Sequence, residues 1–165
     1  MNNLPGAYIE ARLSELNMEL PEMSSPVGNY VKGVIVGDFL YLSGAGPHRP
    51  GQQTWRGKVG REFSLEDGYL AAQWVCLQLL AAAKHVLEGD LGRVKRVVKV
   101  FGMVNCTEDF VDHPKVINGC SDLLIKVLGE AGRHARSAVG MQQLPGGIPV
   151  EIEAIFEIVP NCTVD

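Results

Sequence analysis

The sequence predicts a two-layer α+β fold, in which a mixed sheet of about five strands is covered on one face by two helices. Two long segments repeat apolar residues at helical spacing, and other segments are β-branched or alternate apolar with polar residues. These segments follow the order hairpin, helix, strand, helix, hairpin. The 165 residues fit a single domain, with an N-terminal helix and linker at 1–25, a core at 26–159 and a tail at 160–165.

The N-terminal part of the chain predicts a helix over residues 5–18, followed by a β-hairpin. The hairpin joins residues 31–36 to residues 39–43, because Gly37 and Asp38 form a two-residue loop with glycine in first place. The polar, glycine-rich stretch that follows predicts a loop with at most one short strand.

The two long helices have recognisable ends. Ser64 is a suitable N-cap for the first helix, Asp67 stands where a capping box needs an acid, and Gly89 ends the helix. The second helix starts with an early proline and stops at Gly129. Between the helices, residues 94–104 are rich in β-branched side chains and predict a strand.

A second hairpin, predicted near the C-terminus, carries most of the charged candidates. Arg136 opens a short apolar strand, residues 144–147 turn the chain, and residues 150–158 return as a strand. Side chains alternate between the two faces of that return strand, so one face is apolar and the other carries Glu151, Glu153, Ile155 and Glu157. The second hairpin therefore presents one guanidinium and a row of carboxylates.

Two helices cover only one face of such a sheet. The other face would carry acidic groups together with apolar side chains such as Met141 and Ile155. An open face of this kind indicates self-association, so we expect an oligomer.

Composition and charge exclude several classes of protein. The net charge of −4 and the lack of a basic, aromatic surface argue against a nucleic-acid partner. The four cysteines are widely spaced and lack the spacing of a metal site. We expect them to be free thiols, which suits a reducing compartment such as the cytoplasm. The sequence contains no uninterrupted apolar run of about 18 residues, so no membrane segment is expected. The charged residues near the N-terminus are not typical of a signal peptide.

Arg136 is the leading candidate for binding a small acidic molecule. Its planar fork matches a carboxylate and stays charged at any relevant pH. From its spacing alone, an internal ion pair with Glu151 or Glu153 is the simpler explanation. Glu151 could orient a water molecule or act as a general base, although a solvated carboxylate on a wet face is again the simpler explanation.

Other residues offer weaker signals, each with a structural alternative. Asn118 on the second long helix could contact a ligand or bond to the backbone, and Tyr30 could offer a phenol or simply pack. Residues 43–46, Ser-Gly-Ala-Gly, could bring backbone N–H groups to a ligand or form an ordinary loop. His134 could transfer protons or lie at a surface. The histidines lack the mutual spacing of a metal site, and the glycines are not a dinucleotide motif.

A series of short segments resembles the RidA/YjgF family, in the family's order and spacing, over residues 26–159. The most specific segments are Ala135-Arg136-Ser137, Leu144-Pro145 and Val150-Glu151-Ile152-Glu153-Ala154; the others are Tyr30-Val31-Lys32-Gly33, Ser43-Gly44, Gly89-Asp90-Leu91 and Val116-Ile117-Asn118. The resemblance implies a chorismate-mutase-like α+β fold and a homotrimer with three clefts between subunits. It also implies cofactor-free hydrolysis of reactive imines and enamines to keto acids and ammonia.

The same resemblance implies roles for individual residues. Arg136 would hold the substrate carboxylate, and Glu151 would place the attacking water. The cleft around them would be lined by Tyr30, Ser43, Gly44, Asn118 and Ala138. The chain departs from the usual pattern at Ala45, where a glutamine is common, and at Ala138, where a cysteine or threonine is common. Both departures remove polar groups from the cleft and imply a different, or bulkier and more apolar, substrate.

Three functions follow as hypotheses. The first is a hydrolytic deaminase of 2-imino and enamino acids, without a cofactor or metal. The second is a non-catalytic trimer that binds a small carboxylate, suggested by the two missing polar groups. The third is the ribonuclease or translation-inhibitor activity sometimes assigned to the family, against which the acidic charge balance argues.

Overall fold

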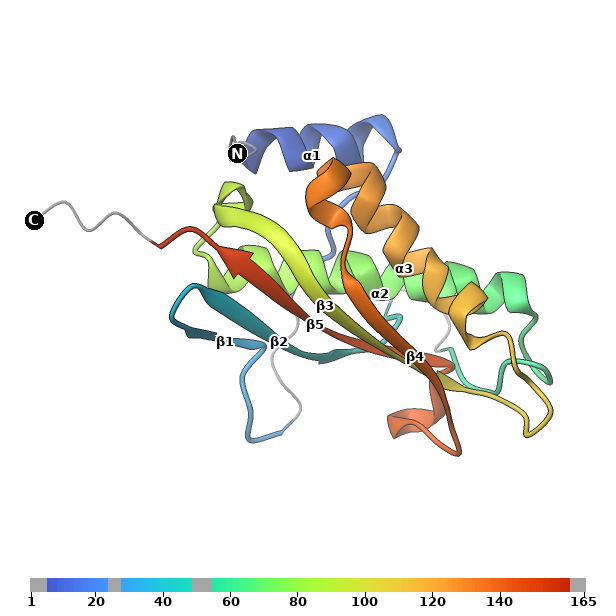
Figure 1. Cartoon of the computed structure of the whole chain (residues 1–165). Helices are drawn as coiled ribbons and strands as arrows, with labels where there is room; N and C mark the ends of the chain where they lie inside the picture. The colour runs from blue at the N-terminus through green and yellow to red at the C-terminus, as the bar shows by residue number, and fades with distance from the viewer. Residues whose placement is uncertain (1–5, 24–27, 49–54, 161–165) are drawn as a thin grey trace, which may run out of the picture.

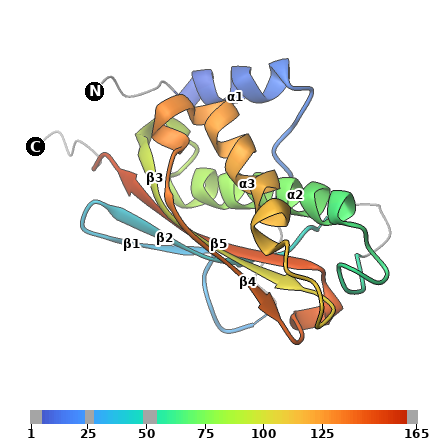
Figure 2. The same cartoon turned by 45° about the vertical axis from the view of Figure 1, so that its right-hand side comes forward.

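Five strands form one sheet, and two long helices pack against one of its faces (Figures 1 and 2). This computed structural model describes residues 6–23, 28–48 and 55–160. The elements are α1 (Gly6–Glu15), β1 (Gly33–Val36), β2 (Phe39–Ala45), α2 (Leu65–Val86), β3 (Val94–Asn105), α3 (His113–Leu128), β4 (Ala135–Met141) and β5 (Val150–Ile158). Three short 3₁₀ turns lie between them: η1 (Leu91–Arg93), η2 (Gly129–Gly132) and η3 (Pro145–Gly147). The predicted α+β class, with α2 and α3 covering one face of a mixed sheet, is confirmed.

The strand order corrects one prediction. The strands lie in the order β1-β2-β5-β3-β4, so β4 and β5 are not neighbours and do not form the predicted second hairpin. Instead β4 pairs in parallel with β3, and β5 lies antiparallel between β2 and β3. The β3-α3-β4 segment is a crossover unit, which places its two strands side by side. The turn before β5 does reverse the chain direction, but the chain crosses the end of β3 there. As a result β5 pairs on the side of β3 opposite to β4.

The position of β5 in the sheet follows from its apolar side chains. Its alternate residues Val150, Ile152, Ala154, Phe156 and Ile158 are all buried under the helices, as the predicted alternation requires. A strand that buries five side chains on one face is best accommodated at the centre of a sheet. The strand that carries Arg136 is shorter and largely half-exposed, and it lies at the edge.

The start of α2 confirms the predicted capping box. The Ser64 hydroxyl accepts a hydrogen bond from the Asp67 backbone N–H at 3.0 Å, and Asp67 accepts one from the Ser64 N–H at 2.9 Å. These bonds satisfy N–H groups that a helix end otherwise leaves unpaired. The buried side of α2 is apolar along its length, which lets α2 lie flat on the sheet.

Two glycines set the position of α3. A Cβ added to Gly119 would lie 2.0 Å from the Tyr69 carbonyl oxygen, so α3 crosses α2 in backbone contact. A Cβ added to Gly102 on β3 would lie 2.5 Å from the side chain of Ile117, so α3 also lies close against the sheet. Because both contacts need glycine, they fix how near the side chains of α3 come to β4.

The first helix is shorter than the predicted 5–18. It ends at Glu15, and Asn17 follows with a positive φ of 54°. Its buried residues Ile9 and Leu13 belong to the main core. The helix α1 lies close to η1 and α3, and Figure 1 shows it above α3. Pro5 lies outside the described residues, as does most of the predicted tail.

The first hairpin is confirmed, with small shifts at its ends. Its register pairs Val36 with Phe39 across Gly37, whose φ is +57°. The first strand begins at Gly33 instead of Val31, and β2 continues to Ala45 through an irregularity in its pairing with β5.

The free thiols are confirmed for three of the four cysteines, Cys76, Cys106 and Cys120; Cys162 lies outside the described residues. Cys76 and Cys120 are buried, as predicted from their helix faces. None of the described helices is long and apolar enough to cross a lipid bilayer.

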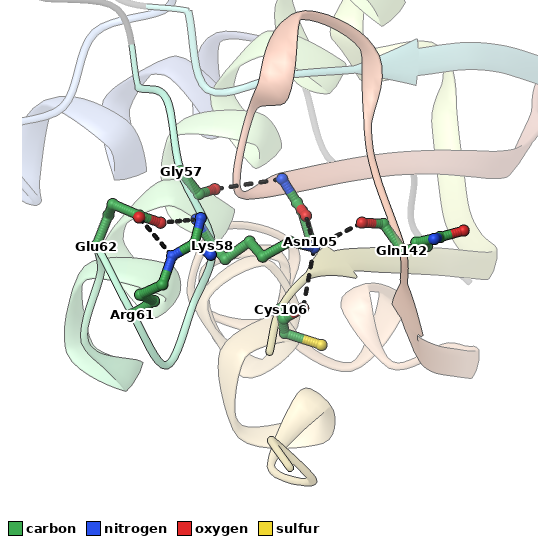
Figure 3. Close-up of polar contacts among 7 residues, drawn as sticks. All are labelled: Gly57, Lys58, Arg61, Glu62, Asn105, Cys106 and Gln142. Carbon is green, nitrogen blue, oxygen red and sulfur yellow. Dashed lines mark hydrogen bonds and ion pairs between the residues drawn. The ribbon is translucent and has the colours of Figure 1, made fainter. Parts of the chain in front are cut away.

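Lys58 ties the loop before α2 to the ends of the sheet (Figure 3). Its ammonium donates to Asn105 Oδ1 at 2.8 Å and to the carbonyl oxygens of Cys106 and Gln142 at 3.2 and 2.5 Å. The amide of Asn105 donates in turn to the carbonyl oxygens of Gly57 and Ile148. These five bonds join three segments that are far apart in the sequence. Of the predicted loop over residues 47–63, the part at 49–54 lies outside the described residues.

Candidate functional site

Arg136 lies at the start of β4, on the edge of the sheet, and points toward α3. It pairs in register with Val100, which is fully buried under the helices, so Arg136 lies on the helix-covered face. Its Nη1 donates to Asn118 Oδ1 at 2.8 Å and to Ser121 Oγ at 3.0 Å. Both acceptors come from α3, whose closeness depends on the two glycine contacts described above.

A chain of hydrogen bonds continues from Ser121 to the loop before β4. Ser121 Oγ lies 3.0 Å from His134 Nε2, and His134 Nδ1 lies 2.6 Å from the Gly132 carbonyl oxygen. A carbonyl only accepts, which assigns the proton of neutral His134 to Nδ1 and leaves Nε2 to accept from the Ser121 hydroxyl. Burial lowers the pKa of His134. The hydrogen bond to the Gly132 carbonyl opposes this by raising the pKa, and the nearby Arg136 charge lowers it further.

Part of the Arg136 fork remains open. Two bonds use both protons of Nη1, which leaves the Nε and Nη2 edge of the guanidinium without a hydrogen-bond acceptor among the described residues. No Asp or Glu of the described chain lies within ion-pair distance of this guanidinium; the described ion pairs all involve other cations. The alternative explanation, an internal ion pair with Glu151 or Glu153, is therefore wrong. We call Arg136, Asn118, Ser121 and His134 the arginine cluster.

The two alanines that depart from the family pattern lie at different places. Ala138 follows Arg136 by two residues on the same face of β4 and packs partly buried against the core. It gives the arginine cluster an apolar neighbour. Ala45 ends β2 and pairs with Ile152 of β5, away from the arginine cluster.

Glu151 lies on the opposite, open face of the sheet. It alternates with the buried Val150 and Ile152 on β5. Its carboxylate lies directly over Gly44, where an added Cβ would be only 2.3 Å from Glu151 Oε1. Burial raises the pKa of Glu151, and the charge of Glu153 raises it further. No described residue forms an ion pair with this carboxylate.

Ser43 precedes Gly44 on β2, and Tyr30 lies three residues before the start of β1. The Ser43 hydroxyl donates to the Val31 carbonyl oxygen at 2.7 Å, and the Ser43 N–H donates to the Lys32 carbonyl. The hydroxyl of Ser43 therefore holds the segment that carries Tyr30. Tyr30 itself is 45% exposed. We call Glu151, Gly44, Ser43 and Tyr30 the glutamate cluster.

One chain does not bring the two clusters together. The register pairs Arg136 with Val100 and Glu151 with Met103, three residues further along β3. An odd step along a strand changes the face, so the two charged side chains point to opposite sides of the sheet. The predicted site residues thus divide into two groups: Arg136 and Asn118, joined by a hydrogen bond, and Glu151 with the first-hairpin residues around Gly44.

Ser121 and His134 complete the arginine cluster. The sequence indicates His134 only as a residue that could transfer protons or lie at a surface, and it connects neither residue with Arg136. Ser121 lies three residues after Asn118, a spacing that places both on one helix face. That spacing was the available signal for Ser121. His134 gives no such signal, because its contact with Ser121 depends on how α3 packs beside β4.

Several hollows lie outside the arginine cluster. One of about 1050 Å³ is bordered by Lys58, Cys106 and His113, and one of about 870 Å³ lies between α1 and α2. A smaller hollow of about 220 Å³ lies on the open face beside Glu153 and Lys99. Within the described ranges, no three His, Cys, Asp or Glu side chains are grouped so that they could bind a metal ion.

Comparisons with known proteins agree with this architecture. The family described as "YjgF/chorismate mutase-like, putative endoribonuclease" matches residues 10–146. Protein TCP17 of Trypanosoma cruzi is 39% identical over 159 residues, which cover 96% of this chain and 99% of that protein.

Two solved structures show the likeness in three dimensions. The crystal structure of Atu1372 from Agrobacterium tumefaciens, a protein of unknown function, has a TM-score of 0.85 at 44% identity and covers 93% of both chains. The crystal structure of RidA from the Antarctic bacterium Psychrobacter sp. PAMC 21119 has a TM-score of 0.55 at 27% identity, covering 81% of this chain and 92% of that one. The chain therefore belongs to the YjgF/chorismate mutase-like family, as its resemblance to the RidA/YjgF family predicted.

Proposed function

We propose that this protein hydrolyses reactive 2-imino and enamino acids to 2-keto acids and ammonia, as a homotrimer in the cytoplasm. In this proposal Arg136 binds the substrate carboxylate, and Glu151 of a neighbouring subunit places the attacking water. The protein needs no cofactor or metal, because the imine carbon is already electrophilic.

The state of Arg136 supports the proposal most directly. Its guanidinium is held by two neutral acceptors, and its charge has no carboxylate partner among the described residues. A fixed guanidinium with an open Nε–Nη2 edge matches the two oxygens of a carboxylate side-on. A partly buried cation without a counter-charge favours an anionic ligand, which would supply that charge.

The chemistry assigned to Glu151 fits its surroundings. A carboxylate whose pKa is raised by burial is a better general base near neutral pH than a solvated one. It would take a proton from water as the oxygen bonds to the imine carbon, and return that proton to the imine nitrogen to give a carbinolamine. As the C–N bond of the carbinolamine breaks, its hydroxyl proton passes to the leaving nitrogen, which releases ammonia and leaves the keto acid.

The homotrimer explains how the two clusters could meet. The arginine cluster lies on β4, one edge of the sheet, and the glutamate cluster lies near β1 and β2, the other edge. Head-to-tail contact between two different edges closes into a ring at a suitable rotation, with both clusters at every junction. The exposed apolar residues on the first hairpin and just before it support such contact, because exposed patches of this kind mark interfaces; they are Tyr30, Val31, Val34, Ile35, Val36, Phe39 and Tyr41.

The test is keto-acid release from imines generated in situ by an amino-acid oxidase. We expect the protein to accelerate release over buffer and Arg136→Ala to abolish the acceleration. Arg133→Ala is the matched control, because Arg133 is exposed, pairs with Glu130 and lies three residues away. No acceleration by the wild-type protein, or equal rates for Arg136→Ala, would contradict the proposal. Sedimentation at micromolar concentration tests the trimer.

A second candidate is a trimer that binds small carboxylates without turnover. It is favoured by Ala138, which leaves an apolar wall beside Arg136 where a polar group is common. Calorimetry with pyruvate separates the two candidates: heat of binding that disappears in Arg136→Ala, without keto-acid release from imines, indicates the binder. RNA cleavage that depends on Arg136 would instead favour the ribonuclease hypothesis.

A further inference from the structure

We propose that His134, acting through the Ser121 hydroxyl, is a positioning residue that holds the Arg136 guanidinium with its Nε–Nη2 edge open to a carboxylate. This inference rests on the proposed role of Arg136 in binding that carboxylate. It adds two residues that do not touch the ligand themselves.

The direction of the hydrogen bonds carries the argument. The Gly132 carbonyl takes the Nδ1 proton of His134, so Nε2 accepts the Ser121 hydroxyl proton. The oxygen of Ser121 then has only lone pairs to offer to Arg136, and it accepts from Nη1 at 3.0 Å. Each donor in this chain has one acceptor, which makes a single arrangement favourable.

Asn118 alone would not fix the fork. One acceptor on Nη1 restrains the position of that nitrogen but leaves the guanidinium free to tilt about the bond. A second acceptor, Ser121, lies on the other Nη1 proton and defines the plane of the group. The hydroxyl of Ser121 could rotate toward another partner if His134 did not accept its proton.

The arrangement also makes the site sensitive to pH. A proton on His134 Nε2 turns that atom into a donor, so Ser121 could no longer donate to it. The added charge would stand beside Arg136, which has no Asp or Glu within ion-pair distance among the described residues. The other charged groups nearby are Asp122 of α3, which accepts a hydrogen bond from the Tyr69 hydroxyl, and Arg133 of the loop, which pairs with Glu130.

Four variants separate the bonds of the chain. His134→Asn keeps a donor toward Gly132 and loses the contact with Ser121, whereas His134→Gln places an acceptor where Nε2 lies. Ser121→Ala removes the hydroxyl, and Ser121→Thr keeps it. His85→Gln on the exposed side of α2 is the matched control.

The first measurement needs no ligand. Side-chain ¹⁵N NMR of Arg136, assigned by comparison with Arg136→Lys, reports the rate of rotation about its Nε–Cζ bond. We expect rotation about tenfold faster in His134→Asn and Ser121→Ala, and within twofold of wild type in His134→Gln, Ser121→Thr and His85→Gln. Rotation within twofold of wild type in both His134→Asn and Ser121→Ala would overturn the positioning role, because either variant breaks the same chain.

The second measurement is the dissociation constant for pyruvate between pH 5 and 8. We expect wild-type binding to weaken as the pH falls through the titration of His134, and His134→Gln to show no such inflection. His134→Asn should weaken binding about tenfold at pH 8, with the fold intact by circular dichroism. An unchanged constant in His134→Asn, with binding still lost in Arg136→Ala, would refute the positioning role alone. Equal binding by wild type and Arg136→Ala would refute the proposed function, while the NMR result still decides the positioning.

Discussion

Arg136 and Lys58 are two partly buried cations held by neutral oxygen atoms, yet they differ in what they leave free. Lys58 donates all three of its ammonium protons, to Asn105, Cys106 and Gln142. Arg136 donates two of its five protons, to Asn118 and Ser121. Neither cation has a carboxylate within ion-pair distance among the described residues.

This difference separates a structural cation from one suited to binding. The acceptors of Lys58 lie around it at the junction of three segments, so its charge is used to hold backbone and a buried amide (Figure 3). The acceptors of Arg136 lie on one side, which fixes the guanidinium without using its other edge. Charge and burial alone would not distinguish the two; the number of unused donors does.

The largest expected effect is at Arg136. Arg136→Ala should lower kcat/KM for imine hydrolysis, or the affinity for pyruvate, by at least about 100-fold, because each bond to a charged group contributes about 1.5–3 kcal/mol. Arg136→Lys keeps the charge but loses the fork and should lower either quantity about tenfold. Unfolding in urea should change little for both variants. Full activity in Arg136→Lys would show that charge alone suffices and would weaken the comparison.

Lys58 should show the opposite pattern. Lys58→Met leaves Asn105 Oδ1 without its donor in a site where Asn105 is 1% exposed. We expect a loss of about 2–3 kcal/mol in the free energy of unfolding by urea, since an unsatisfied buried acceptor costs about 1–3 kcal/mol. Pyruvate affinity should stay within twofold of wild type.

The control for Lys58 is Lys95→Met, which removes an ion pair with Glu157 and should cost under about 1 kcal/mol. If Lys58→Met were as stable as this control but failed to bind pyruvate, the two cations would have exchanged roles.

Glu151 should show a smaller effect on stability than on turnover. Burial first, and then the Glu153 charge, raise its folded pKa above the ordinary value of 4.5. The folded state therefore holds the proton more tightly than the unfolded state, and stability falls as the pH rises from about 4.5 through the folded pKa. Glu151→Gln should remove that loss and raise the melting temperature at pH 7 by roughly 1–2 °C, although keto-acid release should slow.

Glu157→Gln, on the same strand and face, is the matched control and should not raise the melting temperature. A Glu151→Gln protein with a lower melting temperature than wild type would show that the ionised carboxylate stabilises the fold instead of straining it.

The smallest effect is expected at Cys106, which borders the hollow beside Lys58. With pyruvate at saturating concentration, the rate of Cys106 alkylation by iodoacetamide should stay within twofold of the rate without pyruvate. The reason is that Lys58 has no donor left for a carboxylate. Cys76 and Cys120 serve as internal controls, since both are buried and should react only on unfolding. Protection of Cys106 by pyruvate, measured by mass spectrometry, would mean that the Lys58 region also binds the ligand.

Much of the fold follows from local sequence signals. The capping box at Ser64, the tight turn at Gly37 and the stop at Gly129 each depend on residues within a few positions, and the structure has elements that start or end there. The alternation along β5 likewise predicts which of its faces is buried. The strand that pairs with β4 does not follow from such signals. The turn after β4 reverses the chain direction in the same way whether β5 pairs with β4 directly or, as here, β3 lies between them.

The site shows the same division. Arg136, Asn118 and Glu151 are recognisable as candidates from their residue types and from the family resemblance. The sequence also indicates a sheet with one face covered by helices and one uncovered. Strand segments repeat apolar residues every two positions and helices every 3.6 positions, and both repeats can be found in the chain without knowing its tertiary structure. The strand order, the placement of Arg136 and Glu151 on opposite faces, and the link from His134 through Ser121 arise only when helices and sheet pack. Hydrogen bonds between segments depend on distances that glycines at helix crossings set, and no local pattern encodes those distances.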